Sequence, residues 1–371
     1  MRFRLLTAAL LFAILLPCVR SAHAEPHEGA VYVASNEATG NRILQFFRNE
    51  HGDLAPAGSF QTGGLGTGGG LGNQGGLVLT DSGQWLLVVN AGSDDISVFA
   101  VDSDRDSLKL VDRKPSGGRH PISIASKDGL VYVLDAGGAA GAADNVSGFR
   151  LTRGGQLLAI PGSTQPLSTA NVGPAEIHFG SDEDELFVTE KNTNRIDVFE
   201  LDESGSIRSF RTFDSTGITP FGFAVSRFNT ILVSNAAGGA ASASSLTSYQ
   251  FDDGLLNVLA GPVPTNQSAA CWVVATRSGR FAYTTNTGSA SMSGYSIAAD
   301  GAPTLLNADG ITAVTGRGPI DAGFSFGDKF VYVLNSSDHS ISGFSVRRDG
   351  SLGVVGTTTG LPAGANGLAA R

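Results

Sequence analysis

An acidic residue directly followed by a lysine, Glu190 and Lys191 in the stretch TEKNTN, provides groups that are suited to acid–base chemistry. A neighbouring cation keeps a carboxylate ionised, whereas burial raises its pKa towards that of a general acid. Arg119 and His120 are a second adjacent pair, which serves either as charge partners or only as part of a loop. We therefore take Glu190, His120 and Arg119 as candidate catalytic residues.

Other polar and aromatic residues are candidates for contacting a substrate rather than reacting with it. Asparagine or aspartate after a strand often stabilises the turn instead, and a tryptophan can simply fill a space between packed strands. Cys271 is expected to be a small buried residue, because no histidine lies near it in the sequence. The candidate substrate-binding residues are Lys191, Glu176, Asp135, Asp321, Asn286 and Trp272.

Motifs for metal ions and nucleotides are absent or out of context. No two histidines have metal-ligand spacing, and there is no HExxH or CxxC, so we expect no transition-metal site and no cofactor. The stretch GGLGTGGGLGNQGG (63–76) contains the spacing G-x-G-x-x-G, which binds a pyrophosphate where a helix follows it. A strand-like stretch, NQGGLVLT, follows here. The glycines therefore predict a flexible connection, whose backbone N–H groups could still bind an anion.

The elements that position these residues recur along the chain. Four stretches share an apolar strand, a polar residue, a short turn and an alternating strand that ends in an aromatic residue: WLLVVNAGSDDISVF (85–99), LFVTEKNTNRIDVF (186–199), FAYTTNTGSASMSGY (281–295) and VYVLNSSDHSISGF (331–344). Residues 131–149 and 231–249 are copies with five extra loop residues, and residues 31–46 are the first copy. Seven copies at intervals of 45–55 residues indicate a repeat architecture.

Each copy follows an inner strand that often begins with proline, so one repeat supplies four strands. This pattern predicts an all-β fold, a seven-bladed β-propeller of four-stranded antiparallel blades. The first copy lacks an inner strand, and residues 361–370 supply a spare one, so we expect this C-terminal strand to pair into blade 1 and close the ring.

In such a blade, the start of the inner strand and the end of the second strand lie on one face of the disc. A polar ring is therefore expected around the channel on that face, where it could bind a ligand. Carboxylates and carbonyls gathered there also suit Ca²⁺, which is a further alternative. The ring residues that the alignment gives are Glu37, Asn90, Asp135, Glu190, Asn235, Asn286 and Asn335.

The first 24 residues have a basic start, an apolar stretch and Ala22-His23-Ala24, which together are typical of a secretory signal peptide. The mature chain, residues 25–371, would be one propeller domain with 22 basic and 34 acidic residues, a net charge of −12. This charge disfavours nucleic acid as a partner, and no later apolar run predicts membrane insertion. We expect a periplasmic or secreted monomer that binds a small molecule, with Cys271 unable to form an internal disulfide.

The repeat signature VYVLN/LFVTE, the GP-start inner strands and the C-terminal closure resemble the lactonase family of seven-bladed propellers, which includes the 6-phosphogluconolactonase and carboxymuconate cyclase types. The segments GLVYVLDAGG, VTEKNTN, AACWVV and YTTNTG are similar to an exported bacterial branch of that family. The resemblance implies a site made from a glutamate, an arginine and a histidine that act on a lactone. Glu190 matches the glutamate, whereas the arginine and histidine positions hold Ala175 and Ile122.

Two functional hypotheses follow. In the first, the protein is an exported lactonase-like enzyme that hydrolyses or isomerises a small lactone at the polar face. In the second, it is a non-catalytic propeller that binds a small molecule, a glycan or a protein there, because propellers carry many unrelated functions.

Overall fold

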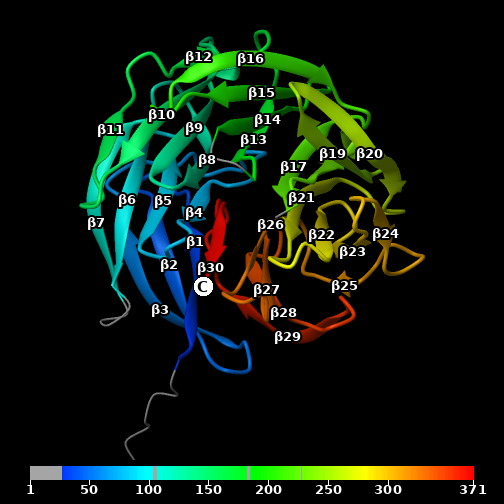
Figure 1. Ribbon diagram of the computed structural model, residues 1–371. Coiled ribbons are helices and arrows are strands. Elements are labelled where there is room, and N and C mark those ends of the chain that lie inside the picture. Colours follow the sequence, from blue (N-terminus) through cyan, green and yellow to red (C-terminus); the bar gives the residue numbers. More distant parts are fainter. Residues whose placement is uncertain (1–26, 103–106, 182–183, 227) are drawn as a thin grey trace, which may run out of the picture.

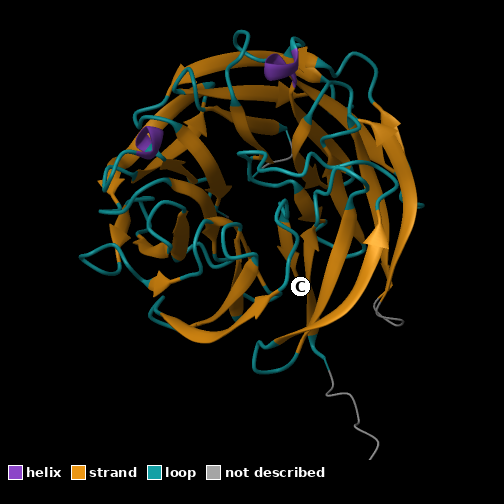
Figure 2. Cartoon of the chain, turned by 180° about the vertical axis from the view of Figure 1, so that it is seen from behind, coloured by secondary structure: helices purple, strands orange, loops and turns teal. Residues whose placement is uncertain are grey.

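Seven antiparallel sheets stand around a common centre in the computed structural model, which describes residues 27–102, 107–181, 184–226 and 228–371 (Figure 1). The described residues contain 30 strands and two short 3₁₀ helices, η1 (Gly137–Ala140) and η2 (Ala237–Gly239). The helices lie in the two longer loops that the alignment identified (Figure 2). The predicted all-β, seven-bladed propeller is confirmed, and the predicted signal peptide lies outside the described residues.

Each blade consists of an inner, a second, a third and an outer strand. From blade 1 onwards, the inner strands are β30 (Leu368–Ala370), β4 (Leu77–Leu79), β8 (Pro121–Lys127), β13 (Pro174–Phe179), β17 (Pro220–Val225), β21 (Ala270–Ala275) and β26 (Pro319–Phe324). The second strands are β1 (Gly29–Ala34), β5 (Trp85–Asn90), β9 (Leu130–Ala136), β14 (Glu185–Glu190), β18 (Ile231–Asn235), β22 (Phe281–Asn286) and β27 (Phe330–Asn335).

The third and outer strands complete the blades. The third strands are β2 (Arg42–Arg48), β6 (Asp95–Asp102), β10 (Asp144–Leu151), β15 (Arg195–Leu201), β19 (Ser245–Asp252), β23 (Ser291–Ile297) and β28 (Ser340–Val346). The outer strands are β3 (Leu54–Gln61), β7 (Ser107–Pro115), β11 (Leu157–Ala159) with β12 (Gln165–Pro166), β16 (Ile207–Asp214), β20 (Leu255–Pro264), β24 (Pro303–Leu305) with β25 (Ala313–Val314), and β29 (Leu352–Thr359).

The hydrophobic cores lie between neighbouring blades, and the second strands supply both sides of them. In β1, Tyr32 packs towards blade 2 with Val88, whereas Val33 packs towards blade 7 with Leu334. Successive side chains of a strand point to opposite faces, so a strand between two cores is apolar at every position. Each fully buried side chain of this size contributes about 1.5–3 kcal/mol to folding.

The ring closes as the sequence predicts. Strand β30 pairs antiparallel with β1, with Val31 opposite Ala370 and Val33 opposite Leu368. The blue start and the red end of the chain therefore lie side by side in Figure 1. This pairing gives blade 1 its fourth strand and pairs the inner edge of β1.

Candidate functional site

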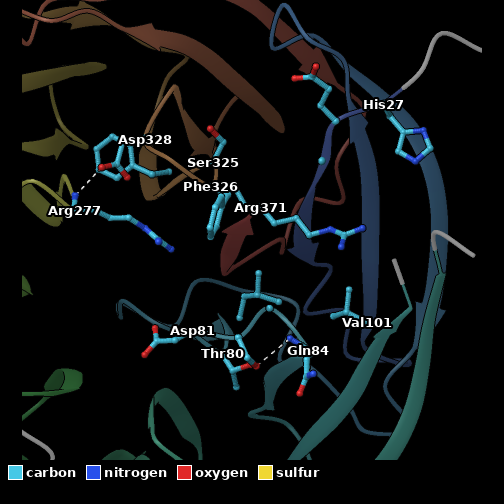
Figure 3. Close-up of a pocket in the computed structure, with 17 residues that line it drawn as sticks. His27, Thr80, Asp81, Gln84, Val101, Arg277, Ser325, Phe326, Asp328 and Arg371 are labelled. Carbon is cyan, nitrogen blue, oxygen red and sulfur yellow. Dashed lines mark hydrogen bonds between the residues drawn. The ribbon is translucent and has the colours of Figure 1, made fainter. Parts of the chain in front are cut away.

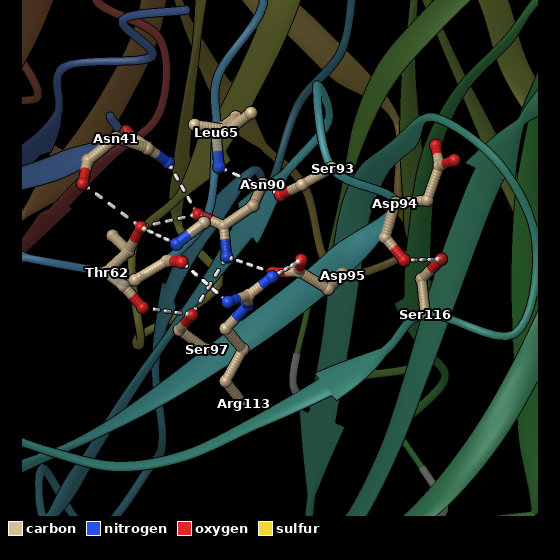
Figure 4. A network of polar contacts seen from close by, with 12 residues as sticks. Asn41, Thr62, Leu65, Asn90, Ser93, Asp94, Asp95, Ser97, Arg113 and Ser116 are labelled. Atoms are coloured by element: carbon tan, nitrogen blue, oxygen red, sulfur yellow. Dashed lines mark hydrogen bonds and ion pairs between the residues drawn. The ribbon is translucent and has the colours of Figure 1, made fainter. Parts of the chain in front are cut away.

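The polar residue at the end of most second strands is buried beneath the connection from the preceding blade. In blade 2, the Asn90 amide donates to Asp95 (2.7 Å) and Ser97 (2.8 Å), and its oxygen accepts from Thr62 (2.7 Å) and Asn41 (2.9 Å) (Figure 4). All the polar atoms of the Asn90 side chain are thus engaged within the protein.

Blades 5, 6 and 7 repeat the donor side of this arrangement, whereas the side-chain oxygens of their asparagines have no hydrogen-bond partner among the described residues. Asn286, a candidate substrate-binding residue, is fully buried and donates to Ser291 (3.1 Å) and Ser293 (2.9 Å). Asn235 and Asn335 likewise donate to two hydroxyl groups of the next strand. These asparagines therefore hold the second and third strands of each blade together, which is the turn-stabilising alternative from the sequence.

Blade 1 departs from the alignment because its turn is longer. Ser35 occupies the place of Asn90. The last paired residues of β1 and β2 are Ala34 and Ile43, and the Ser35 N–H donates to the Arg42 carbonyl one residue beyond this pair. Glu37 lies two residues further on and forms an ion pair with Arg42 (2.5 Å). The placement of Glu37 in the polar ring was therefore wrong by two residues.

Glu190 occupies the equivalent position in blade 4 and is fully buried. Ser168 donates to its carboxylate through both N–H (3.2 Å) and hydroxyl (2.7 Å), and Thr193 donates through its hydroxyl (2.5 Å). Asp197 lies against Glu190, and burial together with this contact raises the pKa of Asp197. The protonated form of Asp197 is therefore favoured inside blade 4.

Asp135, the blade 3 counterpart, is also fully buried. The Ser116 hydroxyl donates to its Oδ1 (2.6 Å), whereas Oδ2 has no hydrogen-bond partner in the described part of the chain. Burial raises the pKa of Asp135 to about 7, and the nearby Asp94 carboxylate adds to this shift. A protonated Asp135 avoids placing a charge in a site of low polarity.

Arg119 and His120 lie at the start of the inner strand of blade 3. The backbone of His120 has a φ of 60°, and its N–H donates to Asp94 (2.8 Å). The guanidinium of Arg119 is exposed and lies 3.5 Å from the other Asp94 oxygen. Burial lowers the pKa of His120. Neither residue hydrogen-bonds or ion-pairs with Glu190 in the described part of the chain.

The glycine-rich connection before blade 2 crosses the mouth of the channel; we call residues 72–76 the strap. Asn73 and Gln74 in the strap are buried. The Gln74 N–H donates to the Ala175 carbonyl of blade 4 (3.0 Å), and its side-chain amide bonds to Val273 of blade 6. The Trp272 indole donates to the Asn73 carbonyl (2.5 Å). The strap thereby ties blade 2 to blades across the ring.

Lys191 reaches the strap from blade 4. Its ammonium donates to the Gly72 carbonyl and lies 4.7 Å from the centre of the Phe221 ring of blade 5. Phe221 in turn packs against Trp272, with ring centres 5.0 Å apart. Burial lowers the pKa of Lys191 to about 8. Lys191 and Trp272 are thus brought together at the channel mouth, with Trp272 buried in the packing.

Glu176 and Asp321 belong to a belt of contacts between inner strands. Glu176 accepts the Phe223 N–H of blade 5 (2.5 Å), and Asp321 accepts the Leu368 N–H of blade 1 (2.9 Å). Burial raises the pKa of Asp321 to about 7. Burial also raises the pKa of Glu176 well above its usual value, and the charge of Asp321 adds to this shift. These carboxyl groups link blades, and both are buried.

The candidate residues therefore fall into separate groups. Glu190 lies inside blade 4, Arg119 and His120 both contact Asp94, and Lys191 lies at the strap. In the described ranges, no group of three histidine, cysteine or acidic residues is arranged to hold a metal ion. Within the same residues, no helix has the length and apolar character needed to cross a bilayer.

The chain belongs to the lactonase family. The family model described as "Lactonase, 7-bladed beta-propeller" matches residues 23–158 and 139–257. No curated protein matches the sequence.

Solved structures share the fold at low sequence identity. A protein from Lactobacillus plantarum matches with a TM-score of 0.71 at 17% identity, over 93% of this chain and 100% of that one. The periplasmic gluconolactonase of Pseudomonas aeruginosa has a TM-score of 0.67 at 15% identity, over 91% and 98% of the two chains. A protein of Bacteroides fragilis, proposed to be a 6-phosphogluconolactonase, has a TM-score of 0.68 at 16% identity, over 92% and 98%.

Proposed function

We propose that the protein is an exported enzyme that opens a small lactone at the channel mouth beside the strap. The observation that supports this proposal is the Lys191 ammonium, a partly buried cation held against Phe221 and the Gly72 carbonyl. Membership of the lactonase family supports lactones as the class of substrate. The protein is proposed to act as a monomer in the periplasm or outside the cell.

The chemistry needs a stabiliser of negative charge. Water adds to the lactone carbonyl carbon, and the electron pair of the C=O bond moves to oxygen. The ring C–O bond then breaks, and the alkoxide takes a proton, which gives a hydroxy carboxylate and one released proton. A preorganised cation such as Lys191 stabilises the developing oxyanion in the way that hydrogen-bond donors do in other acyl-transfer sites.

The other candidate catalytic residues act around this lysine. Glu190 binds Ser168 and Thr193, so it positions the turn that carries Lys191. Its acid–base role stays a prediction, because its carboxylate is fully buried. Arg119 and His120 remain predicted charge partners of the substrate at the same face.

The proposal is tested by acid release in a pH-stat with purified residues 25–371. The substrates are sugar lactones, muconolactones and acyl-homoserine lactones. Lys191→Met should lower kcat/KM at least about 100-fold, and wild-type activity should fall above pH 8 as the ammonium deprotonates. Lys109→Met, at an exposed lysine, is the matched control. Turnover that is unchanged in Lys191→Met contradicts this site, and Glu190→Gln tests the predicted acid–base group separately.

One observation favours the alternative, a propeller that binds a small molecule, a glycan or a protein without reacting. Ile122 and Ala175, at the family histidine and arginine positions, are fully buried apolar residues. Two groups that would polarise a lactone are therefore missing. If no lactone is turned over by the folded protein, we expect the binding function instead.

A further inference from the structure

Blade 4 replaces a repeated pair of neutral polar residues with two acidic ones. In blades 2, 5, 6 and 7, the asparagine that ends the second strand donates to a hydroxyl group of the third strand. The hydroxyl residue lies opposite the position two before the asparagine, and it is Ser97, Thr247, Ser293 or Ser342. In blade 4 the two places hold Glu190 and Asp197, with Asp197 opposite Val188. This departure from the repeat occurs in the blade that carries Lys191.

Glu190 and Asp197, which we call the carboxyl pair, need a proton that an asparagine and a hydroxyl group do not. Glu190 accepts from Ser168 and Thr193, so its oxygens already act as acceptors. Asp197 lies in hydrogen-bonding contact with Glu190, and its Oδ1 accepts from Thr212 (2.7 Å). Its Oδ2 has no donor in the described part of the chain. Two carboxyl groups in contact attract each other only if one is protonated, so Asp197 carries the proton in this arrangement.

Among the described residues, no cation bonds to the carboxyl pair, and both of its members are fully buried. Arg195 on β15 pairs with Asp214 on β16 (3.6 Å), and Arg211 on β16 donates to a backbone carbonyl of blade 5. Asp144, on the blade 3 side, accepts two backbone N–H groups and adds a further negative charge there. Lys191 donates to the strap. Loss of the proton therefore leaves two buried carboxylates in contact without a compensating charge.

The turn after β14 links the carboxyl pair to Lys191. Thr193 belongs to the same turn as Lys191, and Ser168 belongs to the connection that covers it. Two ionised carboxylates in contact repel each other, and Glu190 can separate from its partner only by moving with the hydroxyl groups that it binds. This movement draws the Lys191 ammonium away from the strap.

We propose that Asp197 is a positioning residue whose proton holds Glu190, and with it the turn of Lys191, in the arrangement seen here, and that alkaline pH releases this turn. The switch depends only on contacts inside blade 4 and at the strap. Its effect on catalysis rests on the proposed lactone chemistry, because Lys191 is the group that it positions. Burial and the contact with Glu190 raise the pKa of Asp197 to about 8. The proton is therefore present at neutral pH and is lost as pH rises through about 8.

The fluorescence of Trp272 reports on this turn without any substrate. Trp272 packs against Phe221, which lies next to the Lys191 ammonium, and its indole donates to the strap. The protein has two tryptophans, so Trp85→Phe leaves Trp272 as the only one and serves as the common background. A pH titration of residues 25–371 in this background should show a transition near pH 8.

Two variants remove the titration of the carboxyl pair. Asp197→Asn keeps an acceptor for Thr212, and its amide donates to Glu190 at every pH, so the transition should be absent. The double variant Glu190→Asn/Asp197→Ser gives blade 4 the neutral pair of blades 2, 5, 6 and 7 and should lack the transition as well. Because the other blades fold with this pair, the double variant keeps the test decisive if the single one is unstable.

Three controls separate the carboxyl pair from other titrating groups. Asp135→Asn removes the buried carboxyl group at the equivalent place in blade 3. Asp81→Asn removes an exposed one that lines a hollow of about 810 Å³ at the opposite end of the channel (Figure 3). Lys191→Arg keeps a cation at the strap but one that does not deprotonate near pH 8. All three variants should retain the transition.

The pH dependence of lactone opening gives a second readout. If the reaction needs both the Lys191 ammonium and the Asp197 proton, kcat/KM of the wild type falls about a hundredfold per pH unit on the alkaline side. In Asp197→Asn only Lys191 titrates, so the fall is about tenfold per unit. Equal slopes in the two proteins contradict the positioning role.

The two proposals fail in different ways. Absence of turnover on every lactone contradicts the proposed function and leaves the fluorescence result standing. The role of Asp197 is overturned if the background protein shows no transition near pH 8, if Asp197→Asn or the double variant retains it, or if Lys191→Arg abolishes it. A transition that is lost only in the two carboxyl-pair variants supports the role.

Discussion

The side-chain amide of Gln74 makes two hydrogen bonds to the backbone of Val273, 199 residues later. It donates to the Val273 carbonyl (2.7 Å) and accepts from its N–H (2.9 Å). Gly222 of blade 5 leaves the space for this contact, because a Cβ there would lie 2.1 Å from the Gln74 oxygen. Glu176 accepts an N–H of the next inner strand, but Gly222 in blade 5 has no side chain that could do the same. Gln74 therefore supplies the acceptor for the Val273 N–H between blades 5 and 6.

Gln74→Ala should lower the free energy of unfolding by about 2–4 kcal/mol, because it leaves a buried N–H and a buried carbonyl of Val273 without partners. Urea unfolding followed by circular dichroism measures the change. Gln84→Ala, at an exposed glutamine, is the control and should shift the free energy by less than about 0.5 kcal/mol. Equal effects of the two variants would show that the strap does not brace the ring.

Glycine residues in the connections between blades allow these connections to pack directly against the buried asparagines. A Cβ on Gly217 would lie 2.0 Å from the Asn235 side chain, whereas a Cβ on Gly70 would meet nothing within 4 Å. Gly217→Ala should therefore cost about 1–3 kcal/mol through overpacking. Gly70→Ala should be neutral or slightly stabilising, since it only restricts the unfolded chain. Thermal unfolding of both variants checks this contrast, and a neutral Gly217→Ala would contradict it.

The number of blades and the ring closure could be predicted because both depend on local patterns. Strands such as WLLVVN and FVYVLN repeat with recognisable turns, and residues 361–370 match a missing strand. The role of the polar ring could not be predicted. The sequence alone does not show that a connection will cover Asn286 or Glu190, because the covering residues come from another blade.

The strap was missed for a similar reason. Its glycines signal conformational freedom, yet the residues that fix it, Asn73 and Gln74, bind partners in blades 3, 4 and 6. Such contacts leave no periodic signal. Two amide side chains, Asn73 and Gln74, directly after a glycine run were the available hint in the sequence. The flexible connection that we expected is, at residues 72–76, a packed segment.

Asp321 should make stability depend on pH. Its pKa is 3.8 in the unfolded chain and about 7 in the native protein, so the native state binds more protons between these values. Stability from this group is present in acid and is lost as pH rises through about 7. At 1.36 kcal/mol per pKa unit, the loss is at most about 4 kcal/mol.

Asp321→Asn keeps an acceptor for the Leu368 N–H and removes the titration. Urea unfolding at pH 5 and pH 8 should show a smaller decrease in the variant than in the wild type. Asp300→Asn, at an exposed aspartate, should retain the wild-type decrease. An unchanged pH dependence in Asp321→Asn would mean that Asp321 is already ionised in the native protein at pH 5.

Removing residues 361–371 should abolish cooperative folding, because it opens the ring. Without β30, the edge of β1 loses its pairing, and Asp321 loses the Leu368 N–H that links blade 7 to blade 1. Thermal unfolding should show a broad transition or none, and a synthetic peptide of residues 361–371 added to the truncated chain should restore part of the transition. Val354→Ser, at an exposed position of the outer strand β29, is the control and should leave the transition intact. A truncated chain that unfolds like the wild type would show that β30 is dispensable for the closed ring.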